Sequence, residues 1–175
     1  MAERIMIIGS PGSGKSTLAR ELAAREGLPL FHLDQLYWSA GWVETDKAKW
    51  AAQVAELAAQ PRWIIDGNYS GTQDVRLARA DRVILIDLSP FRCTWRIIKR
   101  VLASRGKTRP DMAEGCPERF SLTFLWYVLS FRIRALPRTL EKLEGYNGEL
   151  VWLGTPHEIA GFLKSEQRLD EDRHE

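Results

Sequence analysis

The sequence has few cysteines, and they form no pattern that could build a metal site or a disulfide framework. Among the 175 residues only Cys93 and Cys116 are cysteines, and they lie far apart with no CxxC pair. A disulfide-stapled domain is therefore disfavoured, and isolated cysteines of this kind are most often small buried apolar residues. Their scarcity favours a reducing compartment, so we expect a cytoplasmic protein.

Long hydrophobic runs are also missing. The longest apolar-looking stretch covers residues 122–131, whereas a membrane-spanning helix needs about 20 apolar residues. The N-terminus leads into a short apolar segment without the basic and longer apolar regions of a signal peptide. We therefore expect no membrane partner. With 45% hydrophobic residues the chain can bury a core, and we expect residues 1–175 to form a single domain.

A glycine-rich loop is the feature around which the chain is organised. Residues 9–17, Gly-Ser-Pro-Gly-Ser-Gly-Lys-Ser-Thr, match the pattern GxxxxGK[ST] at every fixed position. The apolar run before it, residues 5–8, is typical of a buried strand. Residues 18–26 after it have helical spacing, and Gly27 is a plausible helix end. Strand, loop and helix in this order are the context in which the pattern binds phosphates.

The chemistry of such a loop explains its residue types. Glycines let successive backbone N–H groups point inward around an anion, and the following helix N-terminus adds about half a positive charge. The pattern places Lys15 on the β- and γ-phosphates of ATP and the Ser16 hydroxyl on Mg²⁺. We therefore predict ATP and Mg²⁺ as cofactors. The predicted nucleotide contacts in the loop are Gly9, Gly12, Ser13, Gly14, Lys15, Ser16 and Thr17.

Three aspartates follow predicted strands. Strands are expected near residues 28–33, 62–66 and 82–86, and the residues at or after their ends are Asp34, Asp66 and Asp87. Ligands of parallel sheets bind beyond the carboxyl ends of the strands. An apolar strand ending in Asp is typical of the carboxylate that holds Mg²⁺, and the glycine that follows favours Asp66 over Asp87. Asp34 could contact an acceptor or serve as a capping carboxylate, and both interpretations stay open.

A basic segment follows the fourth predicted strand. From Arg92 to Arg138 there are eleven Lys or Arg residues and three acids, although the net charge of the chain is only +2. A helix is expected over residues 90–104, and the polar residues 104–119 are expected to form a mobile loop. Arginine binds phosphate oxygens at two points, so we interpret this loop as a lid over phosphates. Its arginines, with one on the preceding helix, are Arg100, Arg105 and Arg109. An ordinary connecting loop is the alternative.

The remaining segments complete an alternation of strands and helices. Residues 46–60 are expected to form a helix capped by Thr45, and residues 119–143 to be mostly helical, covering the core or meeting a partner. A last strand over 149–153 and a helix over 157–164 follow, and the polar residues 165–175 are expected to be frayed or disordered. Five strands alternating with helices predict an α/β fold, a three-layer α/β/α architecture around a five-stranded parallel sheet.

These motifs resemble those of the adenylate-kinase-like branch of P-loop nucleoside and small-metabolite kinases, especially the bacterial DNA topology modulation proteins. The matching runs are residues 5–22, 32–34, 63–71 and 108–120, and the resemblance covers about residues 1–163. It implies a parallel sheet with strand order 2-3-1-4-5. It also implies an acceptor-binding insert at about residues 35–61 and a short arginine lid at about residues 104–119.

The same resemblance implies roles for two acids. Asp66 stands where adenylate kinases carry an Asp-Gly pair, and Asp34 matches the acid after the second strand of metabolite kinases. Adenylate kinases continue with Phe-Pro-Arg, whereas this chain continues with Asn68-Tyr69-Ser70. The arginine that holds the acceptor's phosphate is therefore not at its usual place.

We therefore predict an ATP- and Mg²⁺-dependent phosphotransferase that acts on a small-molecule acceptor, as a monomer or homodimer. The candidate catalytic residues are Lys15, Asp34, Arg105 and Arg109, the candidate metal ligands are Ser16 and Asp66, and Arg100 is a further nucleotide contact. Two alternatives remain open. One is an ATP-dependent regulator that binds nucleic acid through the basic segment, and the other is an NTPase without an acceptor.

Overall fold

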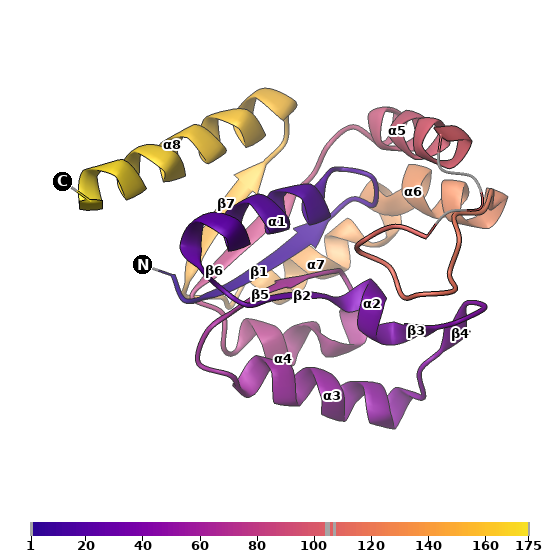
Figure 1. The fold of residues 1–175 in the computed structure, drawn as a ribbon, viewed down its shortest axis with the longest axis horizontal. Coiled ribbons are helices and arrows are strands. Elements are labelled where there is room, and N and C mark those ends of the chain that lie inside the picture. Colours follow the sequence, from indigo (N-terminus) through magenta and orange to yellow (C-terminus); the bar gives the residue numbers. More distant parts are fainter. Residues whose placement is uncertain (1, 104–105, 107, 175) are drawn as a thin grey trace.

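The chain folds around a parallel sheet (Figure 1). The computed structural model describes residues 2–103, 106 and 108–174. The sheet contains β1 (Arg4–Gly9), β2 (Leu30–His32), β5 (Trp63–Asp66), β6 (Arg82–Ile86) and β7 (Glu149–Leu153). Its order is β2-β5-β1-β6-β7, and all neighbouring strands are parallel. Numbered by appearance, these strands follow the order 2-3-1-4-5, so the predicted α/β fold and strand order are confirmed.

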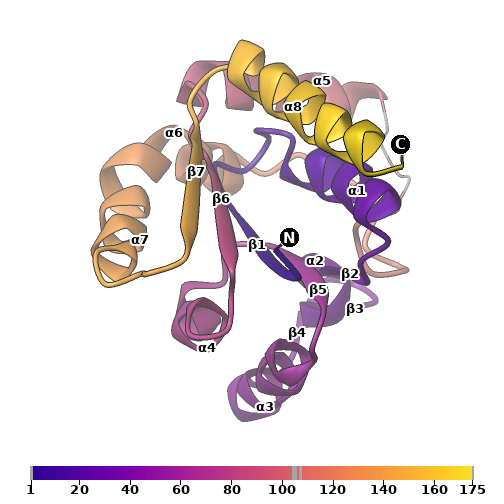
Figure 2. The same ribbon diagram turned by 90° about the vertical axis from the view of Figure 1, so that its left-hand side faces the viewer.

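Helices cover both faces of this sheet and give it three layers (Figure 2). On one face lie α1 (Lys15–Glu26) and α8 (Pro156–His174), and on the other lie α3 (Lys47–Ala59), α4 (Gln73–Leu77) and α7 (Leu136–Leu143). A pair of helices, α5 (Pro90–Ala103) and α6 (Leu122–Arg134), packs side by side. The remaining elements are α2 (Leu33–Tyr37), a 3-10 turn at Ser70–Thr72, and a hairpin of β3 (Trp38–Ser39) and β4 (Val43–Glu44).

The central strand β1 shows why the apolar run was readable from the sequence. Successive side chains of a strand point to opposite faces. Ile5 and Ile7 pack in the cluster beneath α1, while Met6 and Ile8 pack in the cluster that contains Trp50 of α3. Because helices cover both faces, the four buried positions from Ile5 to Ile8 are all apolar, and the run is continuously apolar.

Two predicted boundaries near the site need correction. The second strand ends at His32, and the next two residues already begin α2. The cap of α3 is Asp46 rather than Thr45, since the Asp46 carboxylate accepts hydrogen bonds from the N–H groups of Ala48 (2.9 Å) and Lys49 (3.1 Å). An Asp at this position satisfies N–H groups that the helix leaves without a partner.

The C-terminal tail was predicted to be frayed, and this prediction was wrong for residues 165–174. They continue α8 as far as His174. Glu166 is only 8% exposed and lies 2.9 Å from a guanidinium nitrogen of Arg82 in β6. This long-range ion pair, which composition does not reveal, ties the helix to the sheet. Within the described ranges, neither α8 nor any other helix is long and apolar enough to cross a membrane.

Helix α6 was interpreted mainly as a cover of the core, and this is only half right. Val128 and Phe131 are buried. Leu122, Trp126 and Ile133, on another side of the helix, are 74%, 61% and 81% exposed. These side chains do not pack against the protein's own core, so the alternative of an interface with a partner gains weight.

Candidate functional site

The glycine-rich loop joins β1 to α1, and its path depends on glycine at three positions. Gly9, Gly12 and Gly14 have φ angles of 133°, 77° and 102°, a region that L side chains rarely adopt. A Cβ atom on Gly9 would lie 2.0 Å from the carbonyl oxygen of Ile86, and one on Gly12 would lie 2.8 Å from that of Cys93. The loop is therefore packed tightly between β6 and α5.

The loop brings a positive charge to the N-terminus of α1. The N-cap residue of α1 provides no side-chain hydrogen bond, and the first N–H groups of a helix have no intrahelical partner. The N–H of Thr17 donates to the carbonyl oxygen of Gly14 (3.1 Å), so the N–H groups that precede it are the ones that suit an anion. The ammonium of Lys15 donates to the carbonyl oxygens of Gly9 (3.1 Å) and Ser10 (2.9 Å). Burial lowers the pKa of Lys15, while the nearby carboxylates of Asp66 and Asp34 oppose that shift.

Arg96 is a site residue that the sequence analysis did not single out. Its guanidinium donates to the carbonyl oxygen of Ser13 (3.0 Å) and lies beside Gly14. The signal was its position in α5 one turn before Arg100, since residues four apart share a helix face. Arg96 also borders a surface groove beside the loop, completed by Thr17, Pro156, Ile159 and Leu163 among others. This groove adds an apolar wall next to the predicted phosphate site.

The two candidate metal carboxylates have different surroundings. Asp66, at the end of β5, is 5% exposed, and its Oδ2 lies 2.9 Å from Nδ1 of the buried His32. Asp87, after β6, accepts a 2.8 Å hydrogen bond from Nε of Arg132 in α6. Of these two carboxylates, Asp66 acts on Lys15. The surroundings therefore favour Asp66 beside the phosphates, with Asp87 anchoring α6.

Replacement of each aspartate by asparagine separates these roles. We expect Asp66→Asn to weaken the Mg²⁺-dependent part of ATP binding by about 10–100-fold, the loss typical of a disturbed metal site. Asp87→Asn should leave that part unchanged, since Arg132 already occupies its carboxylate. Titration with a fluorescent ATP analogue, with and without Mg²⁺, measures both effects. Loss of the Mg²⁺ dependence in Asp87→Asn alone would reverse the assignment.

The segment after β5 is tied to the glycine-rich loop. The side chain of Asn68 accepts a hydrogen bond from the N–H of Gly9 (2.9 Å) and donates one to its carbonyl (2.9 Å). Beneath this segment the fully buried Arg76 donates to the carbonyl oxygens of Gly67 (2.8 Å) and Asn68 (2.7 Å). Asn68 stands where the Phe-Pro-Arg pattern of adenylate kinases begins. In this chain its side chain instead holds the backbone of Gly9 in the glycine-rich loop.

Asp34 is held by a tyrosine rather than by a helix terminus. Its Oδ1 accepts a hydrogen bond from the Tyr69 hydroxyl (2.7 Å), and the N-cap of α2 is the preceding His32. Burial raises the pKa of Asp34, the Tyr69 hydroxyl works against this rise, and the charge of Asp66 adds to it. The carboxylate is half-buried, lies in the first turn of α2 and is oriented by Tyr69.

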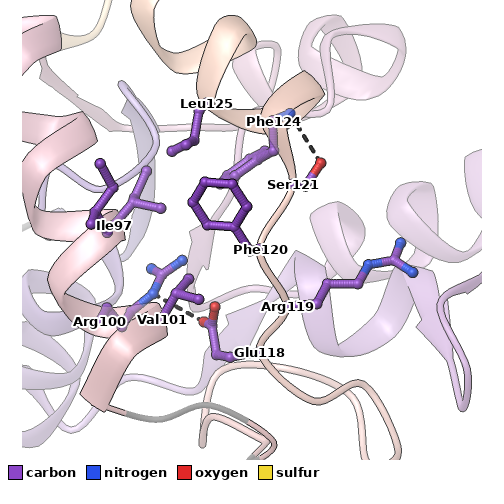
Figure 3. Close-up of a pocket in the computed structure, with 10 residues that line it drawn as sticks. Ile97, Arg100, Val101, Glu118, Arg119, Phe120, Ser121, Phe124 and Leu125 are labelled. Carbon is purple, nitrogen blue, oxygen red and sulfur yellow. Dashed lines mark hydrogen bonds and ion pairs between the residues drawn. The ribbon is translucent and has the colours of Figure 1, made fainter.

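The described part of the lid carries one of the predicted arginines into the site. Arg109 binds the buried Glu118 carboxylate (Nε–Oε1 2.6 Å), and Arg100 of α5 binds the same oxygen (2.9 Å; Figure 3). The positive charge of Arg109 acts on both Lys15 and Asp34. Arg105 lies outside the described residues, and its role therefore remains a prediction.

Asp111 is a lid residue that lies near the glycine-rich loop, and the sequence analysis did not predict this position. It is 6% exposed and lies 3.0 Å from Nη1 of Arg109. Burial alone would raise the pKa of Asp111, but Arg109 and the Ser16 hydroxyl hold it below the usual value. A second carboxylate thus stands on the Ser16 side of the predicted metal position.

The lid also docks on the β3–β4 hairpin of the predicted insert. The N–H of Gly41 donates to the carbonyl of Gly115 (2.9 Å), and the thiol of Cys116 donates to the carbonyl of Ser39 (3.1 Å). The guanidinium of Arg119 lies 4.8 Å from the ring centre of Trp42. Insert and lid therefore close one side of the site together.

The comparisons with known proteins come from solved structures. No family model and no curated protein matches the chain. A gluconokinase from Sinorhizobium meliloti 1021 is similar at 19% identity, covering 97% of this chain and 94% of that chain with a TM-score of 0.51. A shikimate kinase from Bacteroides thetaiotaomicron is similar at 16% identity, covering 98% and 99% with a TM-score of 0.56. The chain therefore shares the fold of these two solved kinases.

At these identities the similarity concerns the fold alone. An uncharacterized protein from Eubacterium ventriosum also shares it, at 14% identity and a TM-score of 0.51 over 97% of this chain and 99% of that chain. The finer resemblance to adenylate kinases and DNA topology modulation proteins is not confirmed by these neighbours. The P-loop fold nevertheless explains why Lys15, Asp34 and Asp66 meet, because all three follow or end parallel strands at one edge of the sheet.

Proposed function

We propose that this protein is an ATP- and Mg²⁺-dependent kinase of a small molecule. The observation that carries the proposal is the convergence of Lys15, Arg109, Asp34 and Asp66 beside the uncapped N-terminus of α1. Two cations and a helix N-terminus can offset the charge of a phosphoryl group in transfer, and phosphoryl transfer needs little beyond positioning and electrostatics. The kinases that share the fold support the same class of reaction.

Each part of the nucleotide has residues that suit it. The N–H groups at the start of α1 and Lys15 would hold the β- and γ-phosphates, and Ser16 and Asp66 would hold Mg²⁺. In the described part of the chain no group of three or more acidic, His or Cys side chains could hold a metal by itself. Mg²⁺ takes several ligands from phosphates and water and is often held by only one or two protein carboxylates. The groove beside Arg96, with its apolar wall, suits the purine base.

The acceptor side suits a hydroxyl better than a phosphate. Asp34, oriented by Tyr69, can accept the proton of a hydroxyl as its oxygen attacks the phosphoryl group. A phosphate acceptor would call for an arginine directed toward it. Arg76 instead points into backbone carbonyls, and Arg109 pairs with Asp111 and Glu118.

The pH dependence of activity tests the role of Asp34. Since the pKa of Asp34 is raised, activity should rise on the acidic side with a midpoint above the ordinary 3.8 of Asp. Tyr69→Phe removes a donor that stabilises the carboxylate, so this pKa should rise further and the acidic limb should move to higher pH. Profiles of kcat/KM against pH measure the shift.

Tyr37→Phe is the matched control, because the Tyr37 hydroxyl donates to Glu44 (2.9 Å) instead. It should leave the acidic limb in place. A limb that moves to lower pH in Tyr69→Phe, or equally in both variants, would exclude Asp34 as the titrating group.

Release of ADP from ATP and Mg²⁺ in the presence of candidate acceptors tests the proposal itself. The panel should contain sugar acids, other hydroxy acids, nucleosides and nucleoside monophosphates. We expect an unphosphorylated hydroxyl compound to raise turnover well above ATP hydrolysis alone, with the phosphorylated product identified by ³¹P NMR. Stimulation by monophosphates alone would indicate a nucleotide kinase, and the absence of any stimulation would favour an NTPase or a regulator.

A further inference from the structure

Helix α5 carries an apolar stripe that points away from the core. Phe91, Trp95 and Leu102 are 79%, 58% and 74% exposed. Ile98, between them, is half-buried. The spacing along the helix is four, three and four residues, an average of about 3.7, which keeps these residues on one side of an α-helix. The buried residues of α5, Cys93, Ile97 and Val101, lie on another side of the helix.

Helix α6 repeats this arrangement. Leu122, Trp126 and Ile133 are exposed to 74%, 61% and 81%, and Leu129 is half-buried. The spacing is again four, three and four residues. Two helices with the same unusual stripe indicate a common cause, because an exposed helix surface of a monomer is normally polar.

The two stripes lie on neighbouring helices, because α5 and α6 pack side by side in antiparallel directions (Figure 1). Arg132, near the end of α6, binds Asp87 just before α5. At the other end, Ile98 of α5 and Leu125 of α6 line the same small pocket, which also contains Phe124 (Figure 3). The buried residues of α5 and Val128 of α6 pack in one core cluster, and both stripes lie on other sides of their helices. We call their exposed residues and the two half-buried ones the α5–α6 face.

The α5–α6 face is larger than an exposed patch on a monomer. With aromatic side chains of roughly 150–250 Å² each and aliphatic ones somewhat smaller, its six exposed residues present on the order of 800 Å². The largest apolar patch on a typical monomer is about 300–600 Å². A standard stable interface buries about 800 Å² on each partner. The combined area is thus of the order that one half of a stable dimer buries, about 800 Å².

We propose that a second copy of this chain covers the α5–α6 face. Two antiparallel helices with seams of the same period form a slab that is complementary to its own twofold-related copy, because each stripe can interdigitate with a stripe of equal spacing. The two slabs together form a four-helix bundle with Trp95 and Trp126 in its centre. This inference does not rest on the proposed kinase activity.

The charge around the α5–α6 face distinguishes a second copy of the chain from other possible partners. Neither α5 nor α6 contains an acidic residue, whereas Arg92, Lys99 and Arg134 border the stripes. In a dimer these positive rims repel each other weakly, so salt should strengthen the association. A nucleic acid, an acidic protein or an anionic membrane would be attracted by the same rims, and salt would weaken its binding.

Dimerisation would also hold the two ends of the lid. The lid leaves the end of α5 and returns to the start of α6. A partner that clamps both helices fixes the anchors from which Arg109 reaches the site. The interface and the site are therefore connected through the lid.

Sedimentation velocity of the full chain, at 50 and 500 mM NaCl, tests the proposal. We expect a species of twice the 20.0 kDa chain mass, with a dissociation constant that falls as salt rises. Trp126→Arg should give a folded monomer, since it places a charge in the centre of the face. Trp152→Arg, at a 47% exposed tryptophan of β7, is the matched control and should remain dimeric.

Circular dichroism and thermal melting establish that each variant is folded. A wild-type protein that is monomeric at both salt concentrations at about 100 μM would overturn the proposal. So would a dimer that survives Trp126→Arg and the second variant Trp95→Arg alike. Vesicles containing phosphatidylglycerol serve as a further probe, and a monomer that binds them less well at high salt would assign the face to an anionic surface instead.

Discussion

We expect Lys15→Ala to reduce ATP-dependent phosphoryl transfer by roughly 10²–10³-fold, the loss typical of removing one preorganised donor from a transition state. Lys15 combines a positive charge with a half-buried position beside Asp66 and Asp34. Alanine removes the positive charge that acts on those carboxylates and the bonds to the carbonyls of Gly9 and Ser10. Turnover at saturating ATP measures the loss in phosphoryl transfer, and direct nucleotide titration measures any loss of ATP affinity.

Lys164→Ala is the matched control for this change. Lys164 is an exposed lysine of α8, so its loss removes the same charge without touching the loop. It should retain full activity, and both variants should give the circular dichroism spectrum of the parent. Wild-type turnover in a folded Lys15→Ala protein would contradict the phosphate-binding role of the loop, whatever the acceptor is.

The largest expected effect on stability belongs to Arg76→Ala. Arg76 is fully buried and donates to four carbonyl oxygens, those of Gly67, Asn68, Tyr69 and Thr72, at 2.7–3.2 Å. Alanine would leave these acceptors without donors and open a cavity. We expect the free energy of unfolding to fall by roughly 3–5 kcal/mol, since charged hydrogen bonds and buried unpaired groups are each worth about 1–3 kcal/mol. Urea denaturation measures this loss.

Arg79→Ala provides the comparison, because Arg79 is exposed just beyond the end of α4. It should change the free energy of unfolding by less than about 0.5 kcal/mol. Arg76→Lys should fall between the two, since lysine can donate fewer bonds from that position. Equal effects of Arg76→Ala and Arg79→Ala would show that the carbonyl contacts contribute little. The comparison matters for the site because two of these carbonyls belong to Asn68 and Tyr69. The side chain of Asn68 clamps Gly9, and that of Tyr69 orients Asp34.

The sequence was most informative where function and fold depend on consecutive residues. The GxxxxGK[ST] pattern lies within residues 9–16, and the left-handed φ angles of its glycines are the reason for their spacing. The strands were readable because both faces of the sheet are covered, which makes them continuous apolar runs. The acids at Asp34 and Asp66 followed from the strand ends.

The predictions for α8 and α6 were wrong where contacts with residues distant in the sequence determine the local structure or burial. The composition of residues 165–174 does not predict a helix, whereas in the structure Glu166 of α8 pairs with the distant Arg82. The density of apolar residues in α6 indicated burial, but density does not say which of them face the sheet. Only the packed helix pair shows that Leu122, Trp126 and Ile133 face outward.

By itself, the sequence determined the strand–glycine loop–helix unit, the α/β architecture and the candidate strand-end acids. These features depend on backbone dihedrals and apolar periodicity, which act over a few neighbouring residues. The tertiary structure alone decided that Asn68 clamps Gly9, that Arg96 reaches Ser13 and that His32 pairs with Asp66. Those contacts join residues 59, 83 and 34 positions apart. A polar side chain has no local preference that names such a partner, because its partner is set by where the folded strands and helices place the other group.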